Sequence, residues 1–155
     1  EGLVGELLAQ KARKVFCVDI SKKIVKFGQT NAEKNGVKNI EFLHGDIEEI
    51  PLKTKSVDVA LFSQSLHHAK KPQTAINEAH RILRASGQLI ILDLLEHQFT
   101  QAKEVYGDHW LGFSKNTLHN WIEESGFSKI NLSEADREED PPHFTTLLAT
   151  AQKHG

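Results

Sequence analysis

Residues Val15-Phe16-Cys17-Val18-Asp19-Ile20 form a short apolar stretch with one acidic residue, and Ser21 follows at once. The apolar run before Asp19 predicts a strand buried on both faces, as in a parallel sheet covered by helices. Asp19 would then lie at the carboxyl end of this strand, the edge where open α/β sheets bind ligands. A carboxylate there can accept two hydrogen bonds from a ribose diol, and its charge strengthens them. Capping of the next helix is the alternative role, although Ser21 is the better capping residue.

Composition excludes several classes of protein. The chain has 155 residues, enough for one domain with a hydrophobic core. Charged residues make up 26% and the formal net charge is −2, so no broad basic field for direct nucleic-acid contact is present. The longest apolar run, at 89–95, is interrupted by Asp93 and is too short to cross a bilayer. With a single cysteine, Cys17, and no signal-like start, we expect a cytoplasmic protein without an internal disulfide or a membrane contact.

Helical and strand patterns alternate along the chain. Helices are predicted at 3–11, 21–35, 72–87 and 114–125, and strands at 15–19, 40–43, 57–62, 89–95, 129–134 and 144–151. In the second helix, Ile20, Ile24 and Phe27 are the expected buried residues. The last two strands follow one another without a helix, which predicts a hairpin. This order predicts a Rossmann-like α/β fold, a three-layer sandwich whose mostly parallel sheet ends in a C-terminal antiparallel hairpin.

Several short motifs follow one another in a definite order. They are Glu1-Gly2, Val18-Asp19-Ile20-Ser21, Gly45-Asp46-Ile47, residues 56–60 (SVDVA) followed by Leu66-His67-His68, and residues 79–89 (AHRILRASGQL). In this order they resemble the motifs of class I S-adenosylmethionine-dependent methyltransferases, and the resemblance covers the whole chain. Within that superfamily the chain is similar to the quinone-biosynthesis-type branch. Residues 108–113 (DHWLGF) are similar to methyltransferase domains that follow arsenical-repressor-type winged-helix regulators.

One part of the family pattern has no counterpart in the chain. The family's first strand and most of the glycine-rich turn after it would precede Glu1. The resemblance places that strand between the strand ending at Asp19 and the one beginning at Val57. Without it, buried backbone groups of both strands would lack partners, at about 1–3 kcal/mol for each unsatisfied group. We therefore expect residues 1–155 to be a single methyltransferase-like domain that is incomplete at its N-terminus.

The resemblance implies S-adenosylmethionine as the cofactor and assigns roles to particular residues. Asp19 would bind the ribose, and Asp46 would accept a hydrogen bond from the exocyclic amine of the adenine. The other implied cofactor residues are Gly2 in the remnant of the turn, Ile20 and Ile47 on either side of the adenine, and Ser63 beside the reacting methyl group. For Gly45-Asp46 an ordinary turn is the alternative, and for the isoleucines an ordinary place in the core.

Two adjacent histidines, His67 and His68, follow the strand that ends near Ser63. An imidazole titrates near neutral pH, so either ring could act as the general base in methyl transfer. Helix capping or simple solvent exposure explains the pair equally well. No metal site is expected, because the histidines are scattered and no pair has ligand spacing with a third partner.

Three aromatic residues, Tyr106, Trp110 and Phe113, lie between the fourth predicted strand and the last helix. The resemblance implies that this segment covers the acceptor, and the aromatic rings suit a flat or apolar small molecule. Core packing is the alternative for Trp110 and Phe113. The sequence does not identify the methyl acceptor, and a homodimer stays open.

Two other functions fit part of the sequence. A nicotinamide-dependent oxidoreductase would share Asp19 and its strand, but it would not be expected to combine Gly45-Asp46 with a closing antiparallel hairpin. A non-catalytic domain that senses a ligand or supports a DNA-binding partner is the second alternative. Sequence upstream of Glu1 would separate this alternative from an enzyme.

Overall fold

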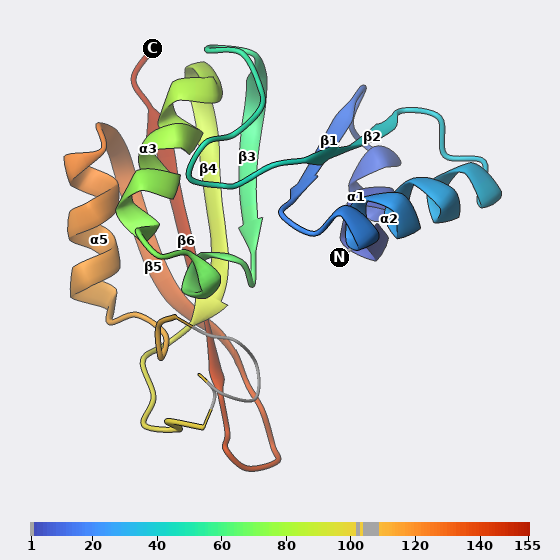
Figure 1. Cartoon of the computed structure of the whole chain (residues 1–155). Helices are drawn as coiled ribbons and strands as arrows, with labels where there is room; N and C mark the ends of the chain where they lie inside the picture. The colour runs from blue at the N-terminus through green and yellow to red at the C-terminus, as the bar shows by residue number, and fades with distance from the viewer. Residues whose placement is uncertain (1, 102, 104–108) are drawn as a thin grey trace. The chain divides into compact units, whose positions relative to one another are not determined.

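The computed structural model describes residues 2–101, 103 and 109–155. The chain divides into two compact units, Glu1–Pro51 and Leu52–Gly155, and each is described by itself (Figure 1). The expectation of a single domain over residues 1–155 stays a prediction.

The first unit contains two helices and a pair of parallel strands. In chain order these are α1 (Gly2–Ala9), β1 (Val15–Asp19), α2 (Lys22–Lys34) and β2 (Ile40–His44). The two strands run in register from Val15 opposite Ile40 to Asp19 opposite His44. Their carboxyl ends therefore lie side by side, and the residues that follow each strand meet at one edge of the sheet.

Local chemistry sets the bounds of α2. Ser21 is its N-cap, and the Ser21 hydroxyl oxygen accepts a hydrogen bond from the Ile24 N–H at 3.3 Å. Gly36, just beyond the end of the helix, has a φ of +71°, a left-handed conformation that glycine adopts without strain. The sequence-based bounds of this helix are confirmed.

The predicted buried face of α2 is wrong. Ile24 and Phe27 are 39% and 67% exposed, and Ile20 before the helix is 68% exposed. Gly28 and Ala32 are the buried residues of the helix instead. A side chain at Gly28 would collide with the ring of Phe42 on β2, so this small residue is what lets α2 lie close to the strand.

The second unit contains a four-stranded sheet in the order β3-β4-β6-β5. Its elements are β3 (Val57–Ser63), the 3-10 helix η1 (Leu66–His68), α3 (Pro72–Ile82), β4 (Leu83–Leu94), α5 (Lys115–Glu124), β5 (Phe127–Arg137) and β6 (Thr145–Lys153). β3 and β4 are parallel, whereas β4–β6 and β6–β5 are antiparallel. The predicted C-terminal antiparallel hairpin is thus confirmed. β5 extends beyond its predicted bounds at both ends, and β6 extends beyond its predicted C-terminal end.

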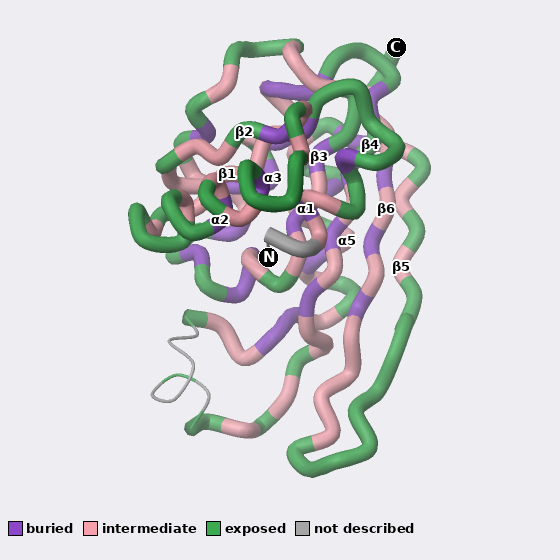
Figure 2. The backbone as a smooth tube through the Cα atoms, turned by 90° about the vertical axis from the view of Figure 1, so that its right-hand side faces the viewer, coloured by how far each residue is buried: buried purple, intermediate pink, exposed green. Residues whose placement is uncertain are grey.

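Aliphatic side chains of the sheet and its helices form the core of the second unit. Buried residues alternate with partly exposed ones along β6, as Figure 2 shows. The fully buried aliphatic residues include Ile76, Leu83, Leu89, Ile91, Leu118, Ile122 and Leu147. α3 packs against both β4 and α5.

The boundary between α3 and β4 differs from the sequence-based expectation. The helix ends at Ile82 rather than near Gly87, and β4 begins at Leu83 rather than at Leu89. Val57 pairs with Leu83 and Val59 pairs with Gln88, so β4 bulges between its first two pairings. Leu83 is therefore part of the strand because it pairs with Val57 of β3. Helical periodicity depends only on neighbouring residues, so it could not predict this pairing.

Within the described residues β1 and β3, like β2 and β5, each have an unpaired edge. β1 pairs only with β2, and β3 pairs only with β4. On β3, Val59 is 51% exposed. The strand that the family resemblance places between β1 and β3 stays a prediction, and these are the two edges it would use.

Candidate functional site

Two carboxylates follow the adjacent strands of the first unit with the same local geometry. One oxygen of Asp19 accepts the Ser21 N–H at 2.8 Å, and one oxygen of Asp46 accepts the Glu48 N–H, also at 2.8 Å. Each side chain thus closes a turn with the backbone two residues further on. Within the part of the chain that the structure describes, neither second carboxylate oxygen has a hydrogen-bond partner, and both residues are half-buried.

The two turns are joined directly. The Gly45 N–H donates to the carbonyl oxygen of Asp19 at 2.9 Å. A Cβ at Gly45 would lie 2.8 Å from Pro51, so the turn after β2 is packed too closely for a larger residue. Asp19 is not the helix cap, because Ser21 holds that position. The structure therefore brings Asp19 and Asp46 together at one edge, as the sequence predicted.

These residues fit the nucleoside part of S-adenosylmethionine. The unpartnered oxygens of Asp19 and Asp46 are acceptors, which match a ribose diol and an adenine amine. Ile20, largely exposed, and Ile47, half-buried, follow the two carboxylates and offer apolar surface beside them. Gly2 is the first residue of α1. The individual roles of these residues stay predictions.

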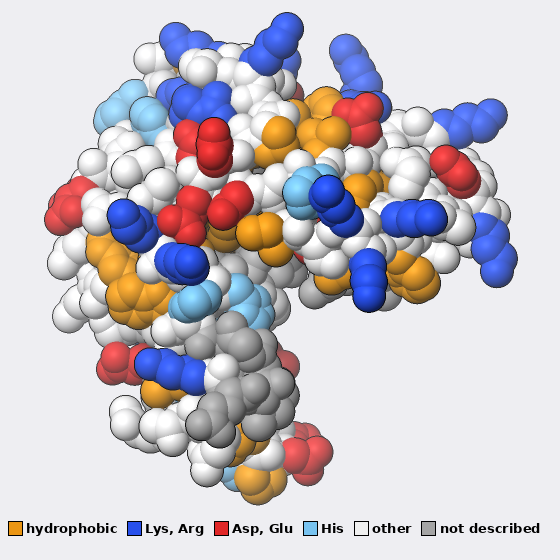
Figure 3. Space-filling view, viewed as in Figure 1, with side chains coloured by type: hydrophobic (Ala, Val, Ile, Leu, Met, Phe, Trp, Pro, Cys, Tyr) orange, Lys and Arg blue, Asp and Glu red, His pale blue; other side chains and the backbone are white. Residues whose placement is uncertain are grey.

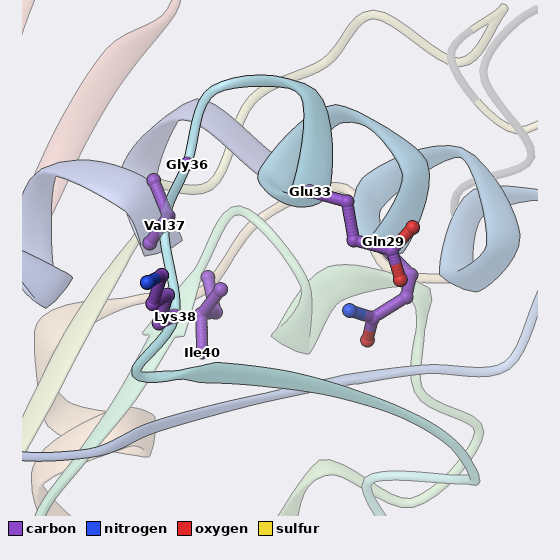
Figure 4. A pocket seen from close by; sticks show the side chains of 6 residues that line it. All are labelled: Gln29, Glu33, Gly36, Val37, Lys38 and Ile40. Atoms are coloured by element: carbon purple, nitrogen blue, oxygen red, sulfur yellow. The ribbon is translucent and has the colours of Figure 1, made fainter.

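A separate hollow of about 380 Å³ lies elsewhere in the first unit, between the end of α2 and the start of β2 (Figure 4). Gln29 and Glu33 of α2 line one side, and Val37, Lys38 and Ile40 line the other. Ile40 begins β2, whereas Asp46 follows the opposite end of that strand. This hollow is therefore not part of the carboxylate site.

In the second unit, Ser63 ends β3 opposite Leu92 of β4. The next residue, Gln64, has a φ of +54° and donates its N–H to the Leu92 carbonyl at 2.8 Å. A left-handed conformation is uncommon for a non-glycine residue, and here it makes a tight turn after β3. The turn directs the chain from β3 into η1, which carries His67 and His68.

A histidine and an aspartate form a buried pair beside this turn. His67 is 6% exposed and Asp93, on β4, is fully buried. The His67 Nδ1 lies 2.7 Å from Asp93 Oδ1, and the His67 backbone N–H donates to Asp93 Oδ2 at 3.1 Å. His68 is exposed, and its ring centroid lies 4.1 Å from that of His67. The histidine pair is thus asymmetric, with one buried ring bound to a carboxylate and one ring at the surface.

Sequence reasoning missed Asp93, which it treated only as an interruption of an apolar strand. The available signal was a single carboxylate within the apolar run 89–95. A buried carboxylate needs hydrogen-bond donors to offset its desolvation, so such a residue predicts a polar partner from elsewhere in the chain. Which partner it finds could not be read from the sequence.

Backbone hydrogen bonds join the segment after β4 to His67 of η1. His109 and Trp110 both donate their backbone N–H groups to the carbonyl oxygen of His67, each at 3.0 Å. Trp110 is half-buried, whereas Phe113 is only 2% exposed and packs edge-on against Trp121 with ring centroids 5.7 Å apart. Tyr106 lies outside the described residues. Of the two aromatic residues that the structure describes here, Trp110 retains exposed surface and Phe113 belongs to the core.

A hollow of about 420 Å³ adjoins Trp110, between residues 96–98 and 109–112. The described residues contain no group of three or more His, Cys, Asp or Glu side chains that could hold a metal ion. Among the same residues, no helix has the length and apolar character needed to cross a membrane. Over the first unit, Figure 3 shows basic side chains with hydrophobic surface between them, in keeping with the exposed Leu7 and Phe27.

A β-α-β chain with carboxylates after successive parallel strands and an antiparallel hairpin at its end defines a Rossmann-like methyltransferase fold. A family model described as "Methyltransferase domain" matches residues 1–91, and the chain belongs to this family. The prediction of a class I methyltransferase is thereby confirmed.

Individual relatives agree with this assignment. The chain is 28% identical over 101 residues to 2-methyl-6-phytyl-1,4-hydroquinone methyltransferase 2 of Oryza sativa subsp. japonica, covering 64% of this chain and 29% of the relative. It is 25% identical over 138 residues to demethylmenaquinone methyltransferase of Bacillus velezensis, covering 83% of this chain and 59% of the relative. The chain thus spans less than two thirds of the length of either relative.

A solved structure supports the same fold. A Bacillus halodurans C-125 protein, assigned to the methyltransferases, matches with a TM-score of 0.82 and 18% identity. The match covers 99% of this chain and 89% of that protein. At this identity the likeness establishes the fold alone.

Proposed function

We propose that this chain is the catalytic domain of an S-adenosylmethionine-dependent methyltransferase that acts in the cytoplasm on a small hydroquinone-type acceptor. The observation that carries this proposal is the pairing of Asp19 and Asp46 at adjacent strand ends, each with one carboxylate oxygen open to a ligand. Membership of the methyltransferase domain family supports it.

The first unit supplies the nucleoside contacts. Asp19 holds the ribose hydroxyls and Asp46 accepts from the adenine amine, while Ile20 and Ile47 lie against the faces of the ring. Gly2 allows close approach of the backbone, and Ser63 in the second unit contacts the methionine part. When bound, S-adenosylmethionine supplies an electrophilic methyl group. The protein's task is then to bind, orient and exclude water.

The second unit supplies the acceptor contacts. His67 acts as the base, His68 contacts the acceptor at the surface, and Trp110 provides a flat apolar surface, with Phe113 supporting it from the core. Tyr106 belongs to the same predicted cover. A hydroquinone ring suits these residues because it is flat and carries an acidic hydroxyl. The names of the two relatives described above refer to a hydroquinone and to demethylmenaquinone.

Binding of the cofactor tests the proposal at its first step. Calorimetry on the full-length protein should detect S-adenosylmethionine and S-adenosylhomocysteine, with no competition from NAD. Tight NAD binding without a response to either sulfur nucleoside would favour an oxidoreductase. Binding of S-adenosylmethionine without methylation of any hydroquinone, arsenite or amine acceptor would favour a sensing module. Transfer of a tritiated methyl group to 1,4-naphthohydroquinone is the result we expect.

A further inference from the structure

His44 is the last residue of β2, and in the parallel register it lies opposite Asp19, the last residue of β1. Its side chain is exposed, and its Nε2 lies 3.0 Å from the carbonyl oxygen of Ile20. A carbonyl oxygen can only accept a hydrogen bond, so Nε2 must carry a proton and donate it. This holds for the neutral ring and for the imidazolium alike. The bond joins the end of β2 to the turn that follows β1.

The peptide group that accepts this bond is also held at its other polar atom. The carbonyl of Ile20 and the N–H of Ser21 belong to one peptide unit. The carbonyl accepts from His44, whereas the N–H donates to Asp19 Oδ1 at 2.8 Å. Because a trans peptide unit is planar and its C=O and N–H point in opposite directions, fixing the carbonyl also fixes the direction of the N–H. The His44 ring and the Asp19 carboxylate therefore hold the same rigid group from opposite sides.

The backbone of Asp19 is fixed by the residue that follows His44. The Gly45 N–H donates to the Asp19 carbonyl oxygen at 2.9 Å. Asp19 is thus restrained at its own carbonyl by Gly45, and at Oδ1 by the peptide that His44 holds. The direction of Asp19 Oδ2, which has no hydrogen-bond partner among the described residues, follows from these two restraints.

We infer that His44 is a positioning residue for cofactor binding, which orients the Asp19 carboxylate toward the ribose of S-adenosylmethionine by holding the Ile20–Ser21 peptide. This inference rests on the proposed function and deepens it. The imidazole acts through the peptide group, so it need not touch the cofactor. A carboxylate that is already oriented loses less conformational freedom when the ligand binds, and more of its hydrogen-bond energy then appears as affinity.

A purely structural role for the His44 bond makes a different prediction. If the bond only extends the pairing of β1 with β2, its loss lowers the stability of the first unit. The folded protein would then keep its affinity for S-adenosylmethionine. Affinity measured on folded variants, and its recovery in a variant that replaces the lost donor, distinguish the two roles.

Isothermal calorimetry with S-adenosylmethionine on the full-length protein compares the parent with three variants of His44. His44→Ala removes the donor, His44→Gln places an amide N–H near the position of Nε2, and His44→Asn is one methylene shorter. We expect the Kd to rise roughly 3- to 10-fold in His44→Ala and His44→Asn, the effect of losing about one hydrogen bond, and to return toward the parent value in His44→Gln. Asn35→Ala is the matched control, because it removes another exposed side-chain bond of the same unit, 2.9 Å to Glu6, and should bind as the parent does.

An unchanged Kd in His44→Ala, folded by circular dichroism, would overturn the inference. A rise that His44→Gln does not reverse, or that Asn35→Ala shares, would overturn it as well. If His44→Ala does not fold, the comparison of His44→Asn with His44→Gln decides the question.

Amide hydrogen exchange of Ser21, measured by NMR without ligands, separates this inference from the proposed function. We expect faster exchange in His44→Ala than in the parent, because the Ser21 N–H is no longer held against Asp19. Unchanged exchange would show that His44 does not hold this peptide, whatever the protein binds. A parent that does not bind S-adenosylmethionine would instead contradict the proposed function.

Discussion

The backbone N–H of Gly45 donates to the carbonyl oxygen of Asp19 at 2.9 Å, so the turn after β2 starts directly beside the end of β1. This bond extends the parallel pairing by one step beyond the strands and brings the Asp19 and Asp46 turns together. The two carboxylates thereby form one acceptor edge, which the first prediction tests.

Asp19→Ala should weaken the affinity for S-adenosylmethionine by roughly 2–4 kcal/mol, because two charge-assisted hydrogen bonds to the ribose are lost and water refills part of the gap. Asp19→Asn should lose less, since the amide keeps one acceptor. Isothermal calorimetry on the full-length protein measures both. Asp58→Ala, at a surface carboxylate that pairs with Arg84, is the control and should bind as the parent does. Unchanged affinity in Asp19→Ala would mean that Asp19 only closes its local turn and does not bind the cofactor.

Gly112→Ala should destabilise the protein by about 1–3 kcal/mol through backbone strain, and by more if the backbone cannot move. Gly112 has a φ of +76°, and a Cβ there would lie 2.5 Å from the Leu95 carbonyl oxygen. Gly36→Ala is a matched control, because its φ is +71° but a Cβ would meet nothing within 4 Å. Urea unfolding gives the two free energies. Equal losses would mean that only the left-handed conformation matters and that the contact with Leu95 is relieved.

His80 should make stability depend on pH. Burial chiefly, and then the charge of Lys153, lower its pKa below the ordinary histidine value. The folded protein therefore disfavours the protonated ring more than the unfolded chain does. The contribution to stability is fully present above the unfolded pKa of about 6.5 and is lost as pH falls from there through the lower folded value.

Urea unfolding of the parent and of His80→Gln between pH 7.5 and pH 5 measures this effect. The parent should lose more stability than the variant on acidification. His119→Gln, on α5, is the control and should follow the parent. Parallel curves for the parent and His80→Gln would show that His80 does not contribute to the acid response.

Residues 1–155 expressed alone should self-associate. β1 and β3 each present an edge without a ladder partner among the described residues, and open edges pair with other chains. Analytical ultracentrifugation should detect oligomers, and Val59→Lys, at an exposed position on β3, should reduce them. A monomer with a sharp cooperative thermal transition would show that these edges need no further strand.

Local sequence determined the elements whose ends depend on neighbouring residues. Ser21 and Ser114 each accept a backbone N–H three residues further on, and Pro72 begins α3, so these helices start where their capping chemistry predicts. The position of the two carboxylates could also be predicted. Each follows an apolar strand, and parallel strands have their carboxyl ends at the same edge of the sheet. The fold class and the Asp19–Asp46 edge could therefore be predicted.

Tertiary structure decided whatever depends on residues far apart in the chain. Ile24 and Phe27 have the spacing of a buried face, yet Gly28 and Ala32 pack inward because only small residues allow α2 to approach Phe42. His67 and Asp93 are separated by 26 residues, and only the parallel alignment of β3 with β4 places the imidazole against the carboxylate. Periodicity reports the exposure that a residue prefers, whereas a hydrogen bond between two elements depends on how the whole sheet is assembled.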